Sequence, residues 1–218
     1  DLQDITISEN GCLSQLKENS IFIDHSTVSP KLILELEKKF SQKNVNFLDA
    51  PISGGQSGAE NGTLSIMVGG NKQAFIRSEK LLKSYGKKIK FMGNSGSGQL
   101  TKIINQICIA GLIQGLSEAI YFMKQTDLSP EDVLEVISSG AAQSWQMENR
   151  FTTMVENKFD FGFAVDLMRK DLSITFEQAK EYGIDLEVTK IVDDFYSEIQ
   201  KMGGNQFDTS SLVKRLIS

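Results

Sequence analysis

Lys102 is the residue of this 218-residue chain whose type and position best suit acid–base chemistry. It follows the glycine-spaced loop Gly93–Gly98 and stands at the start of a long apolar segment, where burial of an isolated ammonium is costly. Asn105 and Gln106 follow at i+3 and i+4, so a helix would place the three side chains on one face. A destabilised cation beside two amides predicts a site for proton transfer. From position alone, a lysine that extends to solvent is an equally good interpretation.

The composition favours a small molecule as the partner. The net charge of -5 argues against a surface for nucleic acid or for an anionic membrane, because either would need concentrated basic side chains. Cys12 and Cys108 are far apart, so we expect no disulfide framework and a cytoplasmic, reducing location. With one histidine and two cysteines, a zinc cluster is not expected, and we predict no metal.

The longest apolar stretch, Ile103–Leu116, is broken by three amide side chains and is shorter than the ~20 apolar residues that span a bilayer. It predicts the buried helix of a soluble protein, apolar nearly all round and therefore covered by protein on every side. Such cover suggests a homo-oligomer. Residues 1–4 show neither an initiator Met nor a signal-peptide pattern, so we expect missing upstream sequence.

The hydrophobic pattern predicts an α/β half followed by an all-helical half. The predicted strands are Ser20–Asp24, Asn46–Asp49, Thr63–Val68 and Lys88–Met92. The predicted helices are Pro30–Gln42, Lys72–Tyr85, Gln99–Thr126, Pro130–Ser138, Ala142–Val155, Val165–Tyr182, Leu186–Met202 and Thr209–Ile217. Ser129 before Pro130 is predicted to cap its helix. The pattern changes at Gly93–Gly98, so we predict domains at residues 1–94 and 95–218.

Several short motifs carry most of the functional information. They are Asp24–Pro30, Asp49–Gly55, Gly58–Leu64, the loop with Lys102, and Lys170–Leu172. In this order and spacing, over essentially the whole chain, they resemble the β-hydroxyacid dehydrogenase family, which includes 3-hydroxyisobutyrate dehydrogenase and tartronate semialdehyde reductase. The resemblance implies the C-terminal part of an NAD(P)-binding Rossmann domain, joined by a long helix to a helical substrate and dimerisation domain. The glycine-rich dinucleotide turn is absent, which implies an N-terminally incomplete chain.

The resemblance assigns the proton transfer and the substrate carboxylate to separate groups. It implies that Lys102 takes the proton from a substrate hydroxyl during oxidation, or gives one to the carbonyl oxygen during reduction. It implies that Ser53, Gly54 and Gly55 hold the carboxylate, since glycines let backbone N–H groups approach an anion. Taken alone, these three residues are better interpreted as a plain turn after a strand.

Further roles follow from the same resemblance. It implies that Asn105 and Gln106 orient the substrate; many relatives have Asn at the second position, and relatives with Gln include tartronate semialdehyde reductases. Alternatively, these amides are hydrogen-bonded within the helical core. The resemblance places Thr27 beside the nicotinamide and lets Lys170 reach the cofactor from the helical domain, whereas taken alone they are better interpreted as a strand-end threonine and a surface lysine. The only histidine, His25, is expected to be structural.

These observations lead to one principal hypothesis and two alternatives. The principal hypothesis is an NAD(P)-dependent oxidoreductase that interconverts a small β-hydroxyacid and its semialdehyde, similar to 3-hydroxyisobutyrate dehydrogenase. The first alternative is a tartronate semialdehyde (2-hydroxy-3-oxopropionate) reductase. The second is a non-catalytic dinucleotide-binding or scaffold protein on the same fold, since one fold hosts unrelated functions. The sequence leaves NAD or NADP open, and Trp145, Phe161 and Phe163 are expected to pack rather than to stack on substrate.

Overall fold

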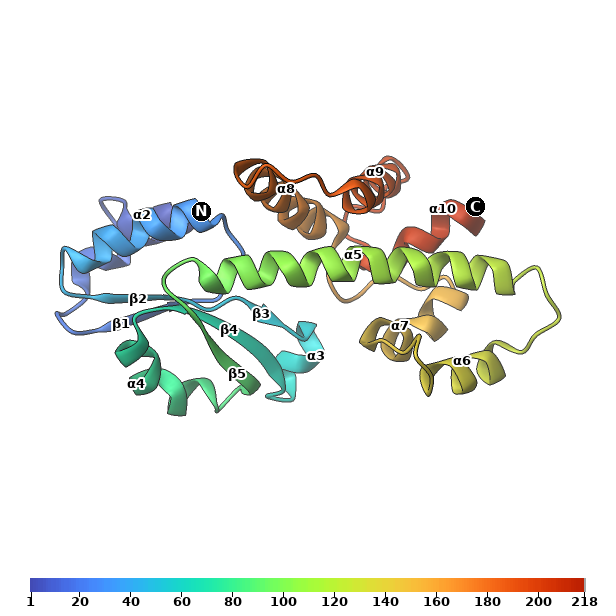
Figure 1. Ribbon diagram of the computed structural model, residues 1–218, viewed down its shortest axis with the longest axis horizontal. Coiled ribbons are helices and arrows are strands. Elements are labelled where there is room, and N and C mark those ends of the chain that lie inside the picture. The colour runs from blue at the N-terminus through green and yellow to red at the C-terminus, as the bar shows by residue number, and fades with distance from the viewer. Residues whose placement is uncertain (218) are drawn as a thin grey trace. The chain divides into compact units, whose positions relative to one another are not determined.

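The computed structural model describes residues 1–217, which form two compact units (Figure 1). Unit 1 is Asp1–Ile104 and unit 2 continues from Asn105. The first is a mixed α/β unit and the second is mainly helical, which confirms the predicted fold class. The division falls within helix α5, Ser97–Met123, later than the boundary predicted after residue 94, because one uninterrupted helix contributes to both units.

Unit 1 contains a five-stranded mixed sheet. Its strands are β1 (Ile21–Asp24), β2 (Asn46–Asp49), β3 (Ile52–Ser53), β4 (Leu64–Gly70) and β5 (Gly86–Gly93). β1 and β2 are parallel, with Phe22 opposite Phe47, whereas β4 is antiparallel to β2 and β3 and parallel to β5. The prediction missed β3, because a two-residue strand is too short to show an alternating pattern.

Helices cover both faces of this sheet. They are α1 (Leu2–Ile7), the 3-10 helix η1 (Cys12–Gln15), α2 (Pro30–Ser41), α3 (Gly55–Glu60) and α4 (Lys72–Leu82). Figure 1 shows α2 and α4 on opposite faces. Side chains alternate along β2 accordingly: Phe47 packs in the cluster with Phe40 of α2, and Leu48 in the cluster with Leu82 of α4. The prediction missed the short helices α1, η1 and α3.

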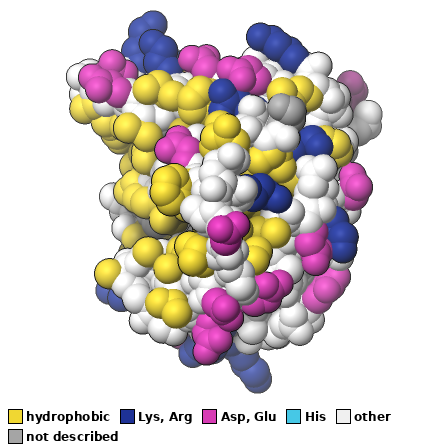
Figure 2. All heavy atoms as spheres, turned by 90° about the vertical axis from the view of Figure 1, so that its right-hand side faces the viewer, with side chains coloured by type: hydrophobic (Ala, Val, Ile, Leu, Met, Phe, Trp, Pro, Cys, Tyr) yellow, Lys and Arg dark blue, Asp and Glu magenta, His cyan; other side chains and the backbone are white. Residues whose placement is uncertain are grey.

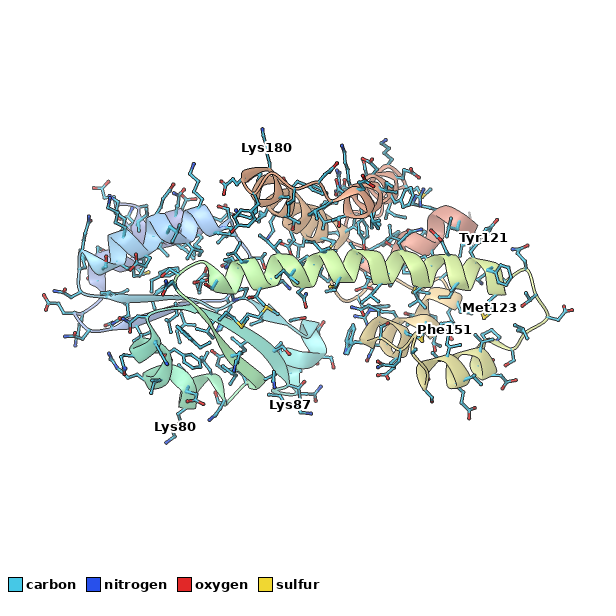
Figure 3. The ribbon with its side chains drawn as sticks, viewed as in Figure 1. Lys80, Lys87, Tyr121, Met123, Phe151 and Lys180 are labelled. Atoms are coloured by element: carbon cyan, nitrogen blue, oxygen red, sulfur yellow. The ribbon has the colours of Figure 1, made fainter. Side chains whose placement is uncertain are left out.

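Unit 2 packs its helices around α5. They are α6 (Pro130–Ser138), α7 (Trp145–Val155), α8 (Val165–Glu181), α9 (Glu187–Lys201), the 3-10 helix η2 (Thr209–Val213) and α10 (Lys214–Ile217). Ile113 of α5 lies in a cluster with α8 and α9. Met123 of α5 lies with Phe151 of α7 in a second cluster (Figure 3). The predicted cap on α6 is confirmed, since Ser129 Oγ accepts the Asp132 N–H at 3.2 Å.

One face of α5 remains exposed. Ile104 and Phe122 are 62% and 73% exposed, and Cys108 and Leu112 lie on the same helical face. The expectation that protein covers this helix on every side is therefore wrong for the single chain. By length and composition alone α5 could cross a membrane, but 44% of its most apolar window is buried within the protein. Figure 2 shows hydrophobic side chains gathered in patches on one face of the molecule, with acidic side chains beside them.

Candidate active site

Lys102 is buried, and its ammonium is directed at the segment predicted to hold a carboxylate. The residue is 7% exposed, and its Nζ donates to the carbonyl oxygen of Ile52 at 2.9 Å. Ile52 immediately precedes Ser53 in strand β3. Unit 1 therefore brings the predicted proton-transfer group to the start of the predicted carboxylate loop. This contact excludes the interpretation of Lys102 as a lysine that extends to solvent.

The backbone after Ser53 adopts conformations that require glycine. Gly54 has φ +133° and Gly55 has φ +62°, in the region that L side chains rarely adopt. A Cβ on Gly54 would also lie 3.3 Å from Leu64 Cδ2. The chain thus turns sharply from β3 into α3, which leaves Gly55 exposed at the turn. An exposed glycine backbone beside a buried lysine can bind a small anion.

A buried carboxylate supports the start of the helix that carries Lys102. Asp49, at the end of β2, accepts the Gly96 N–H at Oδ1 (2.9 Å) and the Gln99 N–H at Oδ2 (3.0 Å). Burial raises the pKa of Asp49 to about 6, although backbone hydrogen bonds lower it in part. A Cβ on Gly98 would lie 2.4 Å from the Met67 carbonyl oxygen. Glycine at position 98 is therefore needed for this close approach.

Gln99 holds the loop that carries Thr27. Its Nε2 donates to the Ser26 carbonyl at 2.8 Å, and its Oε1 accepts the Val28 N–H at 3.2 Å. Both residues that flank Thr27 are thus fixed to α5. No role for Gln99 was predicted from the sequence. Its signal was available, because Gln99 lies three residues before Lys102 on the same helical face.

His25 joins three parts of unit 1 without reaching Lys102 through any described hydrogen bond. Its Nδ1 lies 2.6 Å from the Ala50 carbonyl oxygen, and its Nε2 lies 2.9 Å from the Tyr85 hydroxyl. Since a carbonyl oxygen only accepts, Nδ1 carries a proton, and in the Nδ1–H tautomer Nε2 accepts the Tyr85 O–H. Burial raises the pKa of Tyr85, which keeps its hydroxyl protonated. These contacts agree with the expected structural role.

In unit 2, a buried carboxylate links the predicted amide and the predicted cofactor lysine. Gln106 Nε2 donates to Asp171 Oδ2 at 2.8 Å, and its Oε1 accepts the Asn105 Nδ2–H at 2.8 Å. Lys170 Nζ lies 2.9 Å from Asp171 Oδ1. The amide of Gln106 is therefore engaged inside the helical core, as in the alternative interpretation, while Asn105 is half-buried. Asp171 lies in the Lys170–Leu172 motif, but no role for it was predicted from the sequence.

The predicted site residues thus form two groups. Within unit 1, Lys102 meets the loop of Ser53, and Thr27 lies in a loop held by Gln99. Within unit 2, Asn105, Gln106 and Lys170 are connected through Asp171. The predicted packing residues have other partners: the Arg150 guanidinium lies 4.9 Å from the Trp145 ring centroid and 5.0 Å from that of Phe161, and Phe163 packs on the core of unit 2.

Two family profiles match the chain in succession. Residues 1–93 match the NAD-binding domain of 6-phosphogluconate dehydrogenase. Residues 96–216 match the profile described as NAD-binding of NADP-dependent 3-hydroxyisobutyrate dehydrogenase. The first match ends and the second begins within the glycine-spaced segment Gly93–Gly98 that precedes Lys102.

Individual proteins resemble the chain along nearly its whole length. An uncharacterised oxidoreductase of Shewanella frigidimarina is 48% identical over 99% of this chain and 74% of its own length. The 2-hydroxy-3-oxopropionate reductase of Escherichia coli is 34% identical, again over 99% of this chain and 74% of the relative. The crystal structure of 3-hydroxyisobutyrate dehydrogenase from Salmonella typhimurium superposes with a TM-score of 0.87 at 26% identity, covering 98% of this chain and 74% of that one.

Proposed function

Because the chain belongs to the β-hydroxyacid dehydrogenase family, whose members use NAD or NADP, we propose that it interconverts a small β-hydroxyacid and its semialdehyde, as 3-hydroxyisobutyrate dehydrogenase does. One observation carries the proposal: the buried Lys102 donates to the carbonyl that directly precedes Ser53. A proton-transfer group and an anion-binding turn are what a hydroxyl next to a carboxylate requires. A purely non-catalytic scaffold needs no buried lysine at this position.

Lys102 would handle the proton of the substrate hydroxyl. During oxidation a neutral Nζ takes this proton as the hydroxyl becomes a carbonyl, and during reduction the ammonium returns it to the oxygen. The hydrogen bond to Ile52 fixes the direction of Nζ, so no large rearrangement is needed before transfer. The Ser53 hydroxyl and the backbone N–H groups of Gly54 and Gly55 would hold the carboxylate and thereby set the distance of the hydroxyl from Lys102.

The carboxyl end of β1 in the unit 1 sheet would contact one side of a bound nicotinamide dinucleotide. Thr27 follows the carboxyl end of β1, a parallel strand, where open α/β sheets bind ligands. At the same strand end, the buried Oδ2 of Asp24 has no hydrogen-bond partner among residues 1–217, which suits a site completed by a polar ligand. Thr27 and Lys170 would hold the cofactor, which supplies or accepts the hydride when bound.

The direct test is Lys102→Ala, assayed by NAD(P)H absorbance with 3-hydroxyisobutyrate. We expect turnover to fall by about 10² to 10⁴, because general acid–base catalysis is lost, while KM changes little. Lys124→Ala is the matched control, since Lys124 Nζ also donates to a backbone carbonyl, that of Val155 at 3.1 Å. Equal turnover in both variants would remove Lys102 from the proposed role.

A second candidate activity is the reduction of 2-hydroxy-3-oxopropionate. Two observations favour it: the 34% identity to the Escherichia coli reductase, and glutamine rather than asparagine at position 106. The two activities differ in the substituent beside the carboxylate, methyl in one case and hydroxyl in the other. Comparing kcat/KM for both substrates in one preparation decides between them, since a site built for a hydroxyl should reject the methyl analogue strongly.

The exposed face of α5 supports a homo-oligomer. The proposed enzyme would act in the cytoplasm on small molecules, without nucleic acid or membrane as a partner. Ile104, Cys108, Leu112 and Phe122 lie within one stripe of the helix, and none of them is charged. An apolar stripe of this length is ordinarily covered by another protein surface, here a second copy. Phe122→Glu should then lower the molar mass measured by sedimentation, and an unchanged mass would contradict this surface.

A further inference from the structure

Gln99 is a buried polar side chain of α5 that the proposed proton transfer does not use. It is 1% exposed, and both the donor and the acceptor of its amide form hydrogen bonds. The N–H donor binds the Ser26 carbonyl, and the carbonyl oxygen accepts the Val28 N–H. Since both partners are backbone groups, the amide recognises the path of the loop and not the identity of its side chains.

The same loop has one further anchor on each side of the Gln99 contacts. At its start, Asp24 Oδ1 accepts the N–H and the Oγ–H of Ser26, at 3.1 and 2.7 Å. At its end, Ser29 Oγ accepts the Leu32 N–H at 3.2 Å and caps α2. Removing the Gln99 amide would therefore leave both ends of the loop attached. The change would be confined to the backbone around Thr27.

We propose that Gln99 is a positioning residue, which sets Thr27 relative to Lys102. This inference rests on the proposed function, since it concerns the same proton-transfer site. Gln99 precedes Lys102 by three residues, a rise of about 4.5 Å along the helix. The Gln99 backbone N–H is in turn held by Asp49 at 3.0 Å. The same turn of α5 thus holds the loop of Thr27 and carries Lys102. The predicted cofactor contact and the acid–base group are therefore attached to one rigid helix.

The first test replaces Gln99 by Met, which has a similar length and no hydrogen-bonding amide. The Val28 amide should exchange with solvent about tenfold faster by NMR, because one net hydrogen bond is lost. In the dehydrogenase assay with 3-hydroxyisobutyrate, kcat should fall about 10- to 100-fold, with KM for the hydroxyacid within about twofold, as expected for misplacement of a cofactor-side group.

The chain provides a matched control on the same helix. Gln114 is also buried, and its Nε2 donates to Glu118 Oε1 at 2.7 Å in unit 2. Gln114→Met makes the same chemical change and should leave Val28 exchange and kcat unaltered. If both variants lower kcat equally, the effect is a general one of removing a buried amide, and the positioning role is overturned.

Val28 exchange and kcat report on different things. Val28 exchange reports on the pair of Gln99 hydrogen bonds to Ser26 and Val28, here called the clamp, and kcat reports on catalysis. Faster Val28 exchange with an unchanged kcat would overturn the positioning role while leaving the clamp in place. If Lys102→Ala keeps full turnover, the proposed function fails, whereas Val28 exchange in Gln99→Met still reports whether the clamp exists. Should Gln99→Met not fold, Gln99→Asn withdraws the amide by one methylene and is measured in the same two ways, with the same outcomes deciding.

Discussion

The Lys102 region of unit 1 and the Gln106 region of unit 2 hold their polar groups in different ways. In unit 1, side chains bind backbone: Lys102 donates to the Ile52 carbonyl, and Gln99 binds the backbone on both sides of Thr27. In unit 2, side chains bind side chains, with Asp171 contacting both Gln106 and Lys170. A backbone group remains in place when its own side chain is substituted. The contacts of the Lys102 region therefore depend on the backbone conformation, whereas those of the Gln106 region depend on which side chain each partner carries.

The largest expected effect tests whether the Lys102 region depends on its backbone conformation. Gly98→Ala would place a Cβ 2.4 Å from the Met67 carbonyl oxygen and 2.6 Å from that of Asp49. Because both contacts are backbone, we expect a loss of at least about 3 kcal/mol in the free energy of unfolding by urea. Gly111→Ala on the same helix meets nothing within 4 Å and should gain about 0.5–1 kcal/mol. Similar values for both would show that backbone crowding does not govern this region.

The next effect concerns the buried carboxylate beneath α5. The pKa of Asp49 is raised to about 6 by burial, so the folded protein binds this proton more tightly than the unfolded chain. The stabilisation of the folded protein by proton binding to Asp49 is complete below about pH 4 and is lost as pH rises through about 6. Relative to Asp49→Asn, the wild-type free energy of unfolding should fall by about 3 kcal/mol between about pH 4 and 7. A difference that does not change with pH would contradict the raised pKa.

A smaller effect tests the dependence of unit 2 on partner identity. Asp171→Leu removes the oxygen that accepts from Gln106, and we expect a loss of about 1–3 kcal/mol in the free energy of unfolding because the Gln106 amide is left unpaired in the core. Lys170→Met removes only a half-exposed partner and should cost less than about 1 kcal/mol. Thermal denaturation of both variants gives the comparison. If Lys170→Met were the more harmful change, the ion pair rather than the Gln106 contact would control this region.

The smallest expected effect concerns His25. His25→Asn keeps a donor at the position of Nδ1 and should cost about 0.5 kcal/mol less than His25→Leu, which leaves the Ala50 carbonyl unpaired. Since His25 is the only histidine, ¹⁵N NMR of the imidazole reports one residue and should show the Nδ1–H tautomer. Tyr85→Phe should shift the Nε2 resonance, whereas Tyr182→Phe, at an exposed tyrosine, should not. An Nε2–H tautomer would contradict the assignment.

The same comparison explains what could be predicted from the sequence. The long helices and the β1, β2, β4 and β5 strands have strong periodicity, and the resemblance to a family supplied the roles around Lys102. The short α3 turn was missed because it depends on the positive φ of Gly54 and Gly55, a conformation that periodicity does not show. The contact of Gln106 with Asp171 joins residues far apart in the sequence, so no local pattern could reveal it. The exposed face of α5 was missed because hydropathy does not say which side packs.

Cys108 lies on that exposed face of α5, and its thiol is free, whereas Cys12 is half-buried. A thiol accessible in the single chain would be shielded when a second copy covers the helix. If this surface is used for assembly, the rate of Cys108 alkylation should therefore fall as protein concentration rises. The native Cys108 thiol thus reports on the covered surface by chemical footprinting, and no substitution is needed.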